Sequence, residues 1–170
     1  ERPPLHSFAA SFLRLVRPTA AGTHDDLHHL HVTVIEVFDV HNEKIELHPH
    51  SASASVRRGH TKKAVGGGGA ARWLNESYEK AIDGNEETHT HNEYGPRVND
   101  NNEDHWMMFS FHKPLAEVAR VRLLAKHAFW CRRGVGCCLE LMSGGGVAWQ
   151  HIFTAENIQN DVSLVPDFSA

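Results

Sequence analysis

Histidine is the residue type in this chain that most readily suggests chemistry. The sequence contains 15 His among 170 residues, and imidazole both binds metal ions and titrates near neutral pH. Two groups have spacings that could bring rings to one face of a strand: His28, His29 and His31 form the first, and His89 and His91 form the second. Only alternate residues of a strand share a face, so each group would supply two ligands, and no matching third ligand is evident. We therefore expect most of the histidines to be surface residues.

Groups that could act as acid and base are present but form no recognisable catalytic arrangement. His105 follows Glu103 and Asp104, and such neighbours could transfer protons. The sequence contains no nucleophile elbow, no zinc-protease motif and no paired-carboxylate pattern. We therefore expect the protein not to be an enzyme.

The three cysteines leave two interpretations open. Cys137 and Cys138 are adjacent and Cys131 precedes them, so no CxxC spacing is present and a zinc ribbon is disfavoured. In an oxidising compartment Cys131 could form a disulfide with one member of the pair. Alternatively, the pair supplies small buried residues to a strand.

Length and composition indicate a single globular domain. The chain has 41% hydrophobic and 22% charged residues, and its length is sufficient to enclose a hydrophobic core. A net charge of −4 disfavours a general role in binding nucleic acid. No segment approaches the ~20 apolar residues of a membrane-spanning helix. Because the chain starts at Glu1 without an initiating Met, we expect it to be part of a larger chain or complex.

Short alternating segments predict strands along most of the chain. β-Branched and aromatic residues recur in them, which suits a pleated sheet and disfavours a helix. Seven or eight such segments, separated by turns and long loops, predict an all-β, antiparallel β-sandwich. The expected strands are residues 11–17, 30–40, 44–47, 106–111, 137–142, 147–153 and 161–165, and residues 118–125 are a further candidate.

The segments between these strands are expected to be irregular. Residues 48–72 run from a Ser/Ala-rich stretch through a basic cluster to four consecutive glycines, and should be the least structured part. Residues 73–81 could form one helical turn, and residues 85–104 form a long acidic loop. We expect an N-terminal arm, one sandwich domain and a C-terminal tail, at residues 1–10, 11–166 and 167–170.

Residues 116–128 are compatible with either a helix or a strand. Their Ala, Leu, Glu, Arg and Lys content favours a helix, with Pro114 near its start. Alternation favours a strand, because Ala119, Val121 and Leu123 would share one face. The local signals alone are balanced.

Several short motifs follow one another in a recognisable order. They are IEVFDVHNEKIEL at 35–47, SASAS at 51–55, AIDGN at 81–85, HWMMFSF at 105–111 and VRLLAK at 121–126, followed by Arg133 and Gly136. In this order they resemble the discoidin-like modules, also called coagulation-factor type C domains, of the galactose-binding-domain-like group, and are similar to the F-type, fucose-binding lectins. The resemblance covers residues 11–165. It implies that residues 118–125 form a strand of an eight-stranded jelly-roll sandwich with its ligand loops at one end.

The resemblance implies a ligand site whose residues carry over in part. The lectins bind sugar hydroxyls with an Arg-x-Asp pair, a later Arg and a loop His, because a guanidinium can donate hydrogen bonds to two adjacent hydroxyl groups at once. Here Lys126 occupies the first Arg position, Ala128 the Asp position and Arg133 the later Arg position. The histidine would be His89 or His91.

An aromatic pair lies where these lectins have two adjacent cysteines under the sugar. Phe129 and Trp130 occupy that position here. An aromatic platform can still bind a pyranose face, so the resemblance implies sugar binding of another kind rather than fucose specificity. The expected ligand-binding residues are Lys126, Phe129, Trp130, Arg133, His89 and His91.

The same modules often hold a structural calcium ion beside an Asp-Gly turn. In this chain Asp83 would supply its carboxylate, and Lys80 and Asn85 their carbonyl oxygens. The glutamate that the family usually adds falls at Val34, which weakens such a site. Alternatively, Asp83 only caps a tight turn that suits a positive φ at Gly84.

Two functions are expected from these features. The first is a non-catalytic binding or adhesion module that recognises a glycan or a protein, displayed outside the cell or on the surface of a cell or virion. The second is a structural subunit of a larger assembly that has lost sugar binding, which the incomplete sugar motif favours.

Overall fold

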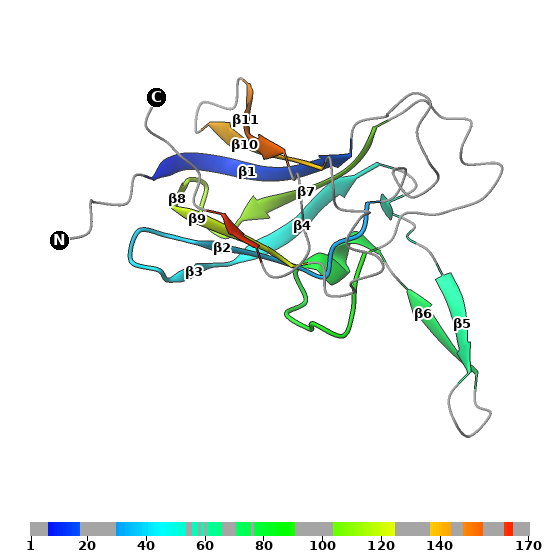
Figure 1. Ribbon diagram of the computed structural model, residues 1–170. Coiled ribbons are helices and arrows are strands. Elements are labelled where there is room, and N and C mark those ends of the chain that lie inside the picture. The colour runs from blue at the N-terminus through cyan, green and yellow to red at the C-terminus, as the bar shows by residue number, and fades with distance from the viewer. Residues whose placement is uncertain are drawn as a thin grey trace.

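The protein folds into antiparallel strands arranged as two packed layers (Figure 1). The computed structural model describes residues 7–17, 30–53, 56–57, 59, 61–65, 71–75, 77–90, 104–124, 137–143, 148–154 and 162–164. Within them the elements are β1 (Phe8–Arg17), β2 (Val34–Phe38), β3 (Lys44–Ile45), β4 (Leu47–Ala52), β5 (Thr61–Val65), β6 (Ala71–Asn75), the 3-10 helix η2 (Tyr78–Ala81), β7 (His105–Phe111), β8 (Ala116–Val118), β9 (Arg120–Leu124), β10 (Cys138–Ser143), β11 (Trp149–Thr154) and β12 (Val162–Leu164).

The larger layer is a six-stranded sheet built around β1. Its order is β11-β10-β1-β7-β4, with β8 also paired to β1. Alternation along β1 sends Leu13 and Leu15 into the core and leaves Phe12 and Arg14 half-buried on the outer face. β7 alternates in the same way. Its buried residues are Met107, Phe109 and Phe111, which the sequence predicted to share one face.

The smaller layer is a four-stranded sheet in the order β12-β9-β2-β3. Its inward side chains include Ile35, Val37, Val121 and Leu123, which join the residues of the larger sheet in one hydrophobic core. The antiparallel β-sandwich predicted from the sequence is therefore confirmed.

The chain passes from one sheet to the other between β7 and β9. β7 and β8 both pair with β1, through Ser110 opposite Phe12 and Ala116 opposite Ala10. Residues 112–115 leave the sheet between these pairings. The next residue after β8, Ala119, donates its backbone N–H to the Phe38 carbonyl of the smaller sheet at 2.9 Å. Residues 116–124 are therefore strand, and the helical alternative is excluded there.

Three boundaries predicted from the sequence were wrong. The strand expected from Ser11 begins at Phe8, which pairs with Val118 of β8. The stretch 48–72, expected to be irregular, contains most of β4 and all of β5, and β5 pairs with β6. The helical turn expected over 73–81 is restricted to η2, because residues 71–75 form β6.

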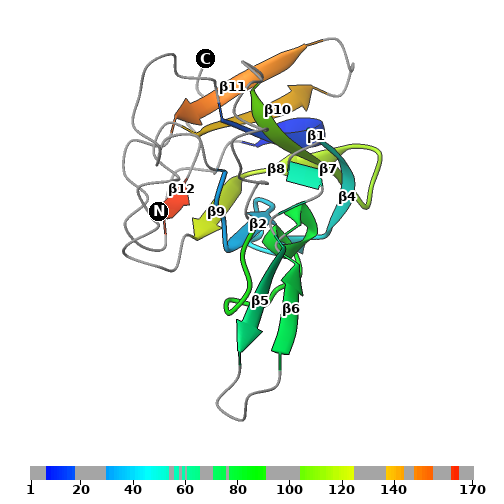
Figure 2. The same ribbon diagram turned by 90° about the vertical axis from the view of Figure 1, so that its right-hand side faces the viewer.

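A two-stranded hairpin extends from the sandwich. β5 and β6 form a separate sheet and project away from the two layers in both views (Figures 1 and 2). Among the residues that the structure describes, no helix has the length and apolar character needed to cross a membrane.

Candidate functional site

The part of the predicted site that the structure describes lies in residues 80–89. It contains His89 of the expected ligand-binding residues and all three expected calcium ligands, Lys80, Asp83 and Asn85. The other expected ligand-binding residues lie outside the described residues: His91, Lys126, Phe129, Trp130 and Arg133.

His89 is held in place by a second histidine. Its ring stacks on that of His31, with the ring centroids 4.4 Å apart and the ring planes 25° apart. His31 is buried, with 1% exposure, whereas His89 is half-buried. The sequence placed these residues in two separate candidate groups, and the fold brings one member of each group together.

Thr90 fixes the backbone next to His89. Its N–H donates to the Val32 carbonyl at 2.8 Å, and its hydroxyl accepts the Val32 N–H at 3.0 Å. Thr90 is fully buried. The end of the 82–90 loop is thereby attached to the segment that leads into β2, and the position of His89 is determined by both backbone and ring contacts.

The Asp83 carboxylate closes the tight turn after η2. Its Oδ1 accepts the Asn85 N–H at 2.9 Å, and its Oδ2 accepts the Thr88 hydroxyl at 2.8 Å. Gly84 has a φ of +71°, as predicted, and a Cβ added there would have nothing within 4 Å. Backbone conformation rather than space therefore favours glycine at this position.

Several contacts at the turn bear on the expected calcium site. The Lys80 ammonium lies 3.5 Å from Asp83 Oδ2, so a cation already neutralises part of the carboxylate charge. The Asn85 carbonyl accepts the Thr88 N–H at 3.1 Å. Val34, at the position of the family glutamate, is buried and apolar. These bonds show how Asp83 caps the turn, and calcium binding stays a prediction.

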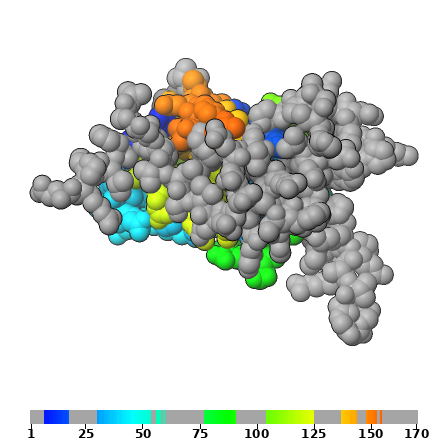
Figure 3. Space-filling model, in the orientation of Figure 1, coloured from blue at the N-terminus to red at the C-terminus, as the bar shows by residue number. Residues whose placement is uncertain are grey.

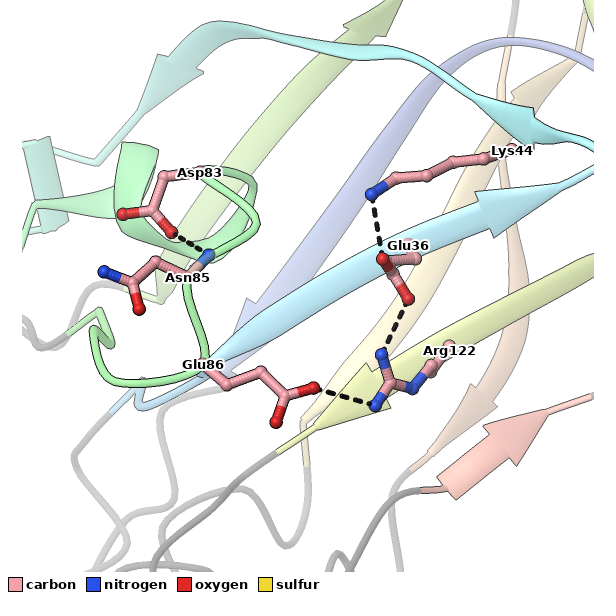
Figure 4. A network of polar contacts seen from close by, with 6 residues as sticks. All are labelled: Glu36, Lys44, Asp83, Asn85, Glu86 and Arg122. Carbon is pink, nitrogen blue, oxygen red and sulfur yellow. Dashed lines mark hydrogen bonds and ion pairs between the residues drawn. The ribbon is translucent and has the colours of Figure 1, made fainter.

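A charged network joins the 82–90 loop to the smaller sheet (Figure 4). Arg122 on β9 donates from Nη1 to Glu36 on β2 at 2.7 Å and from Nη2 to Glu86 in the loop at 3.3 Å. Lys44 on β3 donates to the other oxygen of Glu36 at 2.8 Å. One carboxylate thus connects three neighbouring strands, and Arg122 extends the connection to the loop.

The electrostatics of this network favour its charged form. Burial of Glu36 pushes its pKa upward, but hydrogen bonds from Lys44 and Arg122 and the positive charges of both outweigh burial, so the pKa lies below 4.5. The sequence analysis did not identify this network. The one available signal was that Arg122 alternates with Val121 and Leu123, and only the register places it directly opposite Glu36.

The cysteine pair places one thiol in the core. Cys137 is fully buried and Cys138 is half-buried, whereas the third cysteine, Cys131, lies outside the described residues. Burial raises the pKa of Cys137 to about 11, although the nearby Arg17 acts in the opposite direction. At neutral pH this thiol is protonated, which makes it a poor nucleophile or metal ligand.

No protein-family model, no curated protein and no solved structure matches this chain. The discoidin-like resemblance therefore rests on the sequence motifs alone.

Proposed function

We propose that the protein is a non-catalytic binding module of the discoidin type that recognises a glycan or another protein through loops at one end of the sandwich. The observation that carries the proposal is the arrangement of His89, which is half-exposed but stacked on the buried His31. An imidazole can donate or accept a hydrogen bond, so it suits the hydroxyl groups of a sugar or the polar groups of a protein.

The contacts that hold the 82–90 loop in place support ligand binding. Thr90 attaches one end of the 82–90 loop, Arg122 contacts Glu86 within it, and Asp83 closes its first turn. A group already held in position loses little conformational freedom when a ligand binds, which favours affinity. His89 thus lies on a segment with little to reorganise.

A glycan array with the purified protein tests the proposal. We expect wild-type protein to bind a defined set of glycans, and His89→Ala and Trp130→Ala to lose most of this binding. His151→Ala is the matched control, since His151 is an exposed histidine on β11. Binding that survives both substitutions would show that the proposed loop end is not the site.

A structural subunit is the second candidate function. The observation that favours it is the β5–β6 hairpin, which forms its own sheet and projects from the sandwich (Figures 1 and 2). A projecting hairpin offers contact surface to a neighbouring chain. A negative glycan array, combined with a stable complex on native purification that is lost when residues 61–75 are replaced by a short Gly-Ser linker, would support this function instead.

A further inference from the structure

Three side chains with metal-binding atoms converge on the edge of the larger sheet, away from the loop just described. His48 Nε2 lies 3.4 Å from His112 Nδ1. Glu46 Oε1 lies 3.9 Å from His48 Nε2, and Glu46 Oε2 lies 3.9 Å from His112 Nδ1. Ligand atoms of all three residues lie within 4.8 Å of one another.

Strand register brings these residues together. β4 pairs with β7 through Leu47 opposite Phe111 and His48 opposite Ser110, and the His112 N–H donates to the Glu46 carbonyl at 3.2 Å. Glu46 therefore lies opposite His112, and His48 is the diagonal neighbour of His112. Since Leu47 and Phe111 pack toward the core, alternation directs the other three side chains outward together.

The spacing of the nitrogen atoms fits a tetrahedral metal ion. Two imidazole nitrogens bound to zinc at ~2.05 Å with a tetrahedral angle lie about 3.3 Å apart. The observed separation of 3.4 Å is close to this value. The carboxylate oxygens, at 3.9 Å, would have to move about 0.6 Å closer to reach the corresponding separation of about 3.3 Å. The Glu46 side chain is 67% exposed, so rotation about its own bonds can provide this movement.

A groove borders two of the three residues. Glu46 and His112 are among the residues that line a space of about 500 Å³ between the β2–β3 turn and the 112–117 segment. The β2–β3 turn lies at the end of the sandwich opposite η2 (Figure 1). Cyan atoms of this part of the chain reach the surface in Figure 3. The side chains of Glu46, His48 and His112 are 67%, 45% and 68% exposed, so ions can reach them from solvent.

We propose that Glu46, His48 and His112 bind a divalent transition-metal ion, with zinc as the best fit. Two imidazoles and one carboxylate are a ligand set used by zinc sites that keep an open coordination position. Calcium and magnesium prefer sites made of oxygen ligands, which this set is not. The open position would take water or a ligand atom from the groove. This site is separate from the loop of His89 and does not rest on the function proposed above.

The ordinary alternative is a hydrogen bond between two neutral imidazoles beside a solvated carboxylate. One ring would donate to the other at 3.4 Å, and Glu46 would contribute an ion pair only when a ring is protonated. This arrangement needs no metal ion, so a test must show that the three residues act as one site.

Titration of the metal-free full chain with Zn²⁺ at pH 7.5, by calorimetry, provides the test. We expect His48→Ala and His112→Ala each to lose one equivalent of tight Zn²⁺ binding. Glu46→Gln should weaken that equivalent by more than the roughly 10–100-fold that loss of an outer-shell partner costs. His151→Ala is the matched control, because His151 is exposed and lies outside both the cluster and the groove. This control should keep the stoichiometry of the wild type.

A second measurement separates this site from weak binding by other histidines. Zn²⁺ should raise the melting temperature of the wild type, because it binds only the folded pairing of β4 with β7. The rise should be absent in His48→Ala and His112→Ala, and excess EDTA should reverse it in the wild type. The substituted side chains are 45% exposed at His48 and 68% exposed at His112, so the metal-free variants should melt near the wild-type temperature. Equal stoichiometry and an equal melting shift in wild type and both variants would overturn the proposal.

Discussion

Arg122 lies directly opposite Glu36 on the outer face of the smaller sheet, and its guanidinium donates to the carboxylate at 2.7 Å. The two side chains are only 20% and 18% exposed, so water screens this pair less than an ordinary surface pair. Arg122 also contacts Glu86. One arginine thus couples the strands of the sheet to the loop that carries His89.

Replacing Arg122 should destabilise the fold. An exposed ion pair contributes about 1 kcal/mol or less, whereas breaking a buried pair costs about 3–5 kcal/mol. The exposure of this pair lies between these cases, so we expect Arg122→Ala to lower the free energy of unfolding by about 2 kcal/mol. Urea denaturation measures this quantity.

Lys44 provides the control for the Arg122 substitution. It bonds the same carboxylate at 2.8 Å, but its side chain is 53% exposed. Lys44→Ala should therefore change the free energy of unfolding by less than about 1 kcal/mol. Equal losses for the two variants would contradict the argument that burial distinguishes them.

The pKa of Glu36 predicts how stability depends on pH. Hydrogen bonds from Lys44 and Arg122 hold its pKa in the folded protein below the ordinary value of 4.5, despite burial. The unfolded chain therefore binds a proton at a higher pH than the folded protein does. The stabilisation is complete above pH 4.5 and is lost as the pH falls through the folded-state pKa.

Glu36→Gln should reveal this dependence. We expect the variant to be less stable than the wild type at pH 6, and the difference to shrink as the pH is lowered toward 3.5. Urea denaturation across this range measures the difference. Glu79→Gln is the control, since Glu79 is exposed on η2. A constant difference between wild type and Glu36→Gln at all pH values would rule out a linked titration of Glu36.

Phe109 should be a major contributor to stability. Its side chain is fully buried on β7 and packs near Tyr78 of η2, with ring centroids 5.9 Å apart. Removing such a ring leaves a cavity and lowers the free energy of unfolding by about 3–5 kcal/mol. Phe109→Ala should therefore melt at a much lower temperature than the wild type. Phe12→Ala is the control, because Phe12 lies half-buried on the outer face of β1. Thermal denaturation by circular dichroism should show a much smaller shift for Phe12→Ala.

Sequence periodicity predicted the fold class and much of the core. The alternation of Met107, Phe109 and Phe111 correctly gave the buried face of β7. Residues 116–124 could not be assigned from local signals, because their composition favours a helix. Pairing of β9 with β2 and β12, and of β8 with β1, decided the outcome, and such tertiary contacts override local propensity.

Other elements were missed because their sequences have few strand-forming residues. β4 contains Pro49, which usually argues against a strand, but β4 is an edge strand and an edge tolerates proline. β5 and β6 flank the four glycines that suggested an irregular loop. Pairing of the two strands could not be inferred from that composition.

Candidate sites were harder to predict than the fold, since they combine residues that are distant in sequence. Val32 and Thr90, whose bonds position His89, are 58 residues apart. His48 and His112 are 64 residues apart. A pattern search within short windows finds neither pair, and only the folded structure shows that they are neighbours.

Two variants of Asp83 separate its possible roles. Asp83→Asn keeps an oxygen that can accept the Asn85 N–H and the Thr88 hydroxyl, but it removes the charge that calcium would require. If capping is the role of Asp83, Asp83→Asn should unfold near the wild-type temperature. Asp83→Ala should then lower the free energy of unfolding by about 1 kcal/mol, because the turn loses its acceptor.

Calcium titration completes the comparison. Under the capping role, millimolar CaCl₂ should leave the melting temperatures of wild type and Asp83→Asn unchanged, because Lys80 and Thr88 already occupy the carboxylate. A calcium-dependent rise in the wild type that is absent in Asp83→Asn would instead establish a structural calcium ion at this turn. It would require the Lys80 ammonium, now 3.5 Å from the carboxylate, to move away when the ion binds.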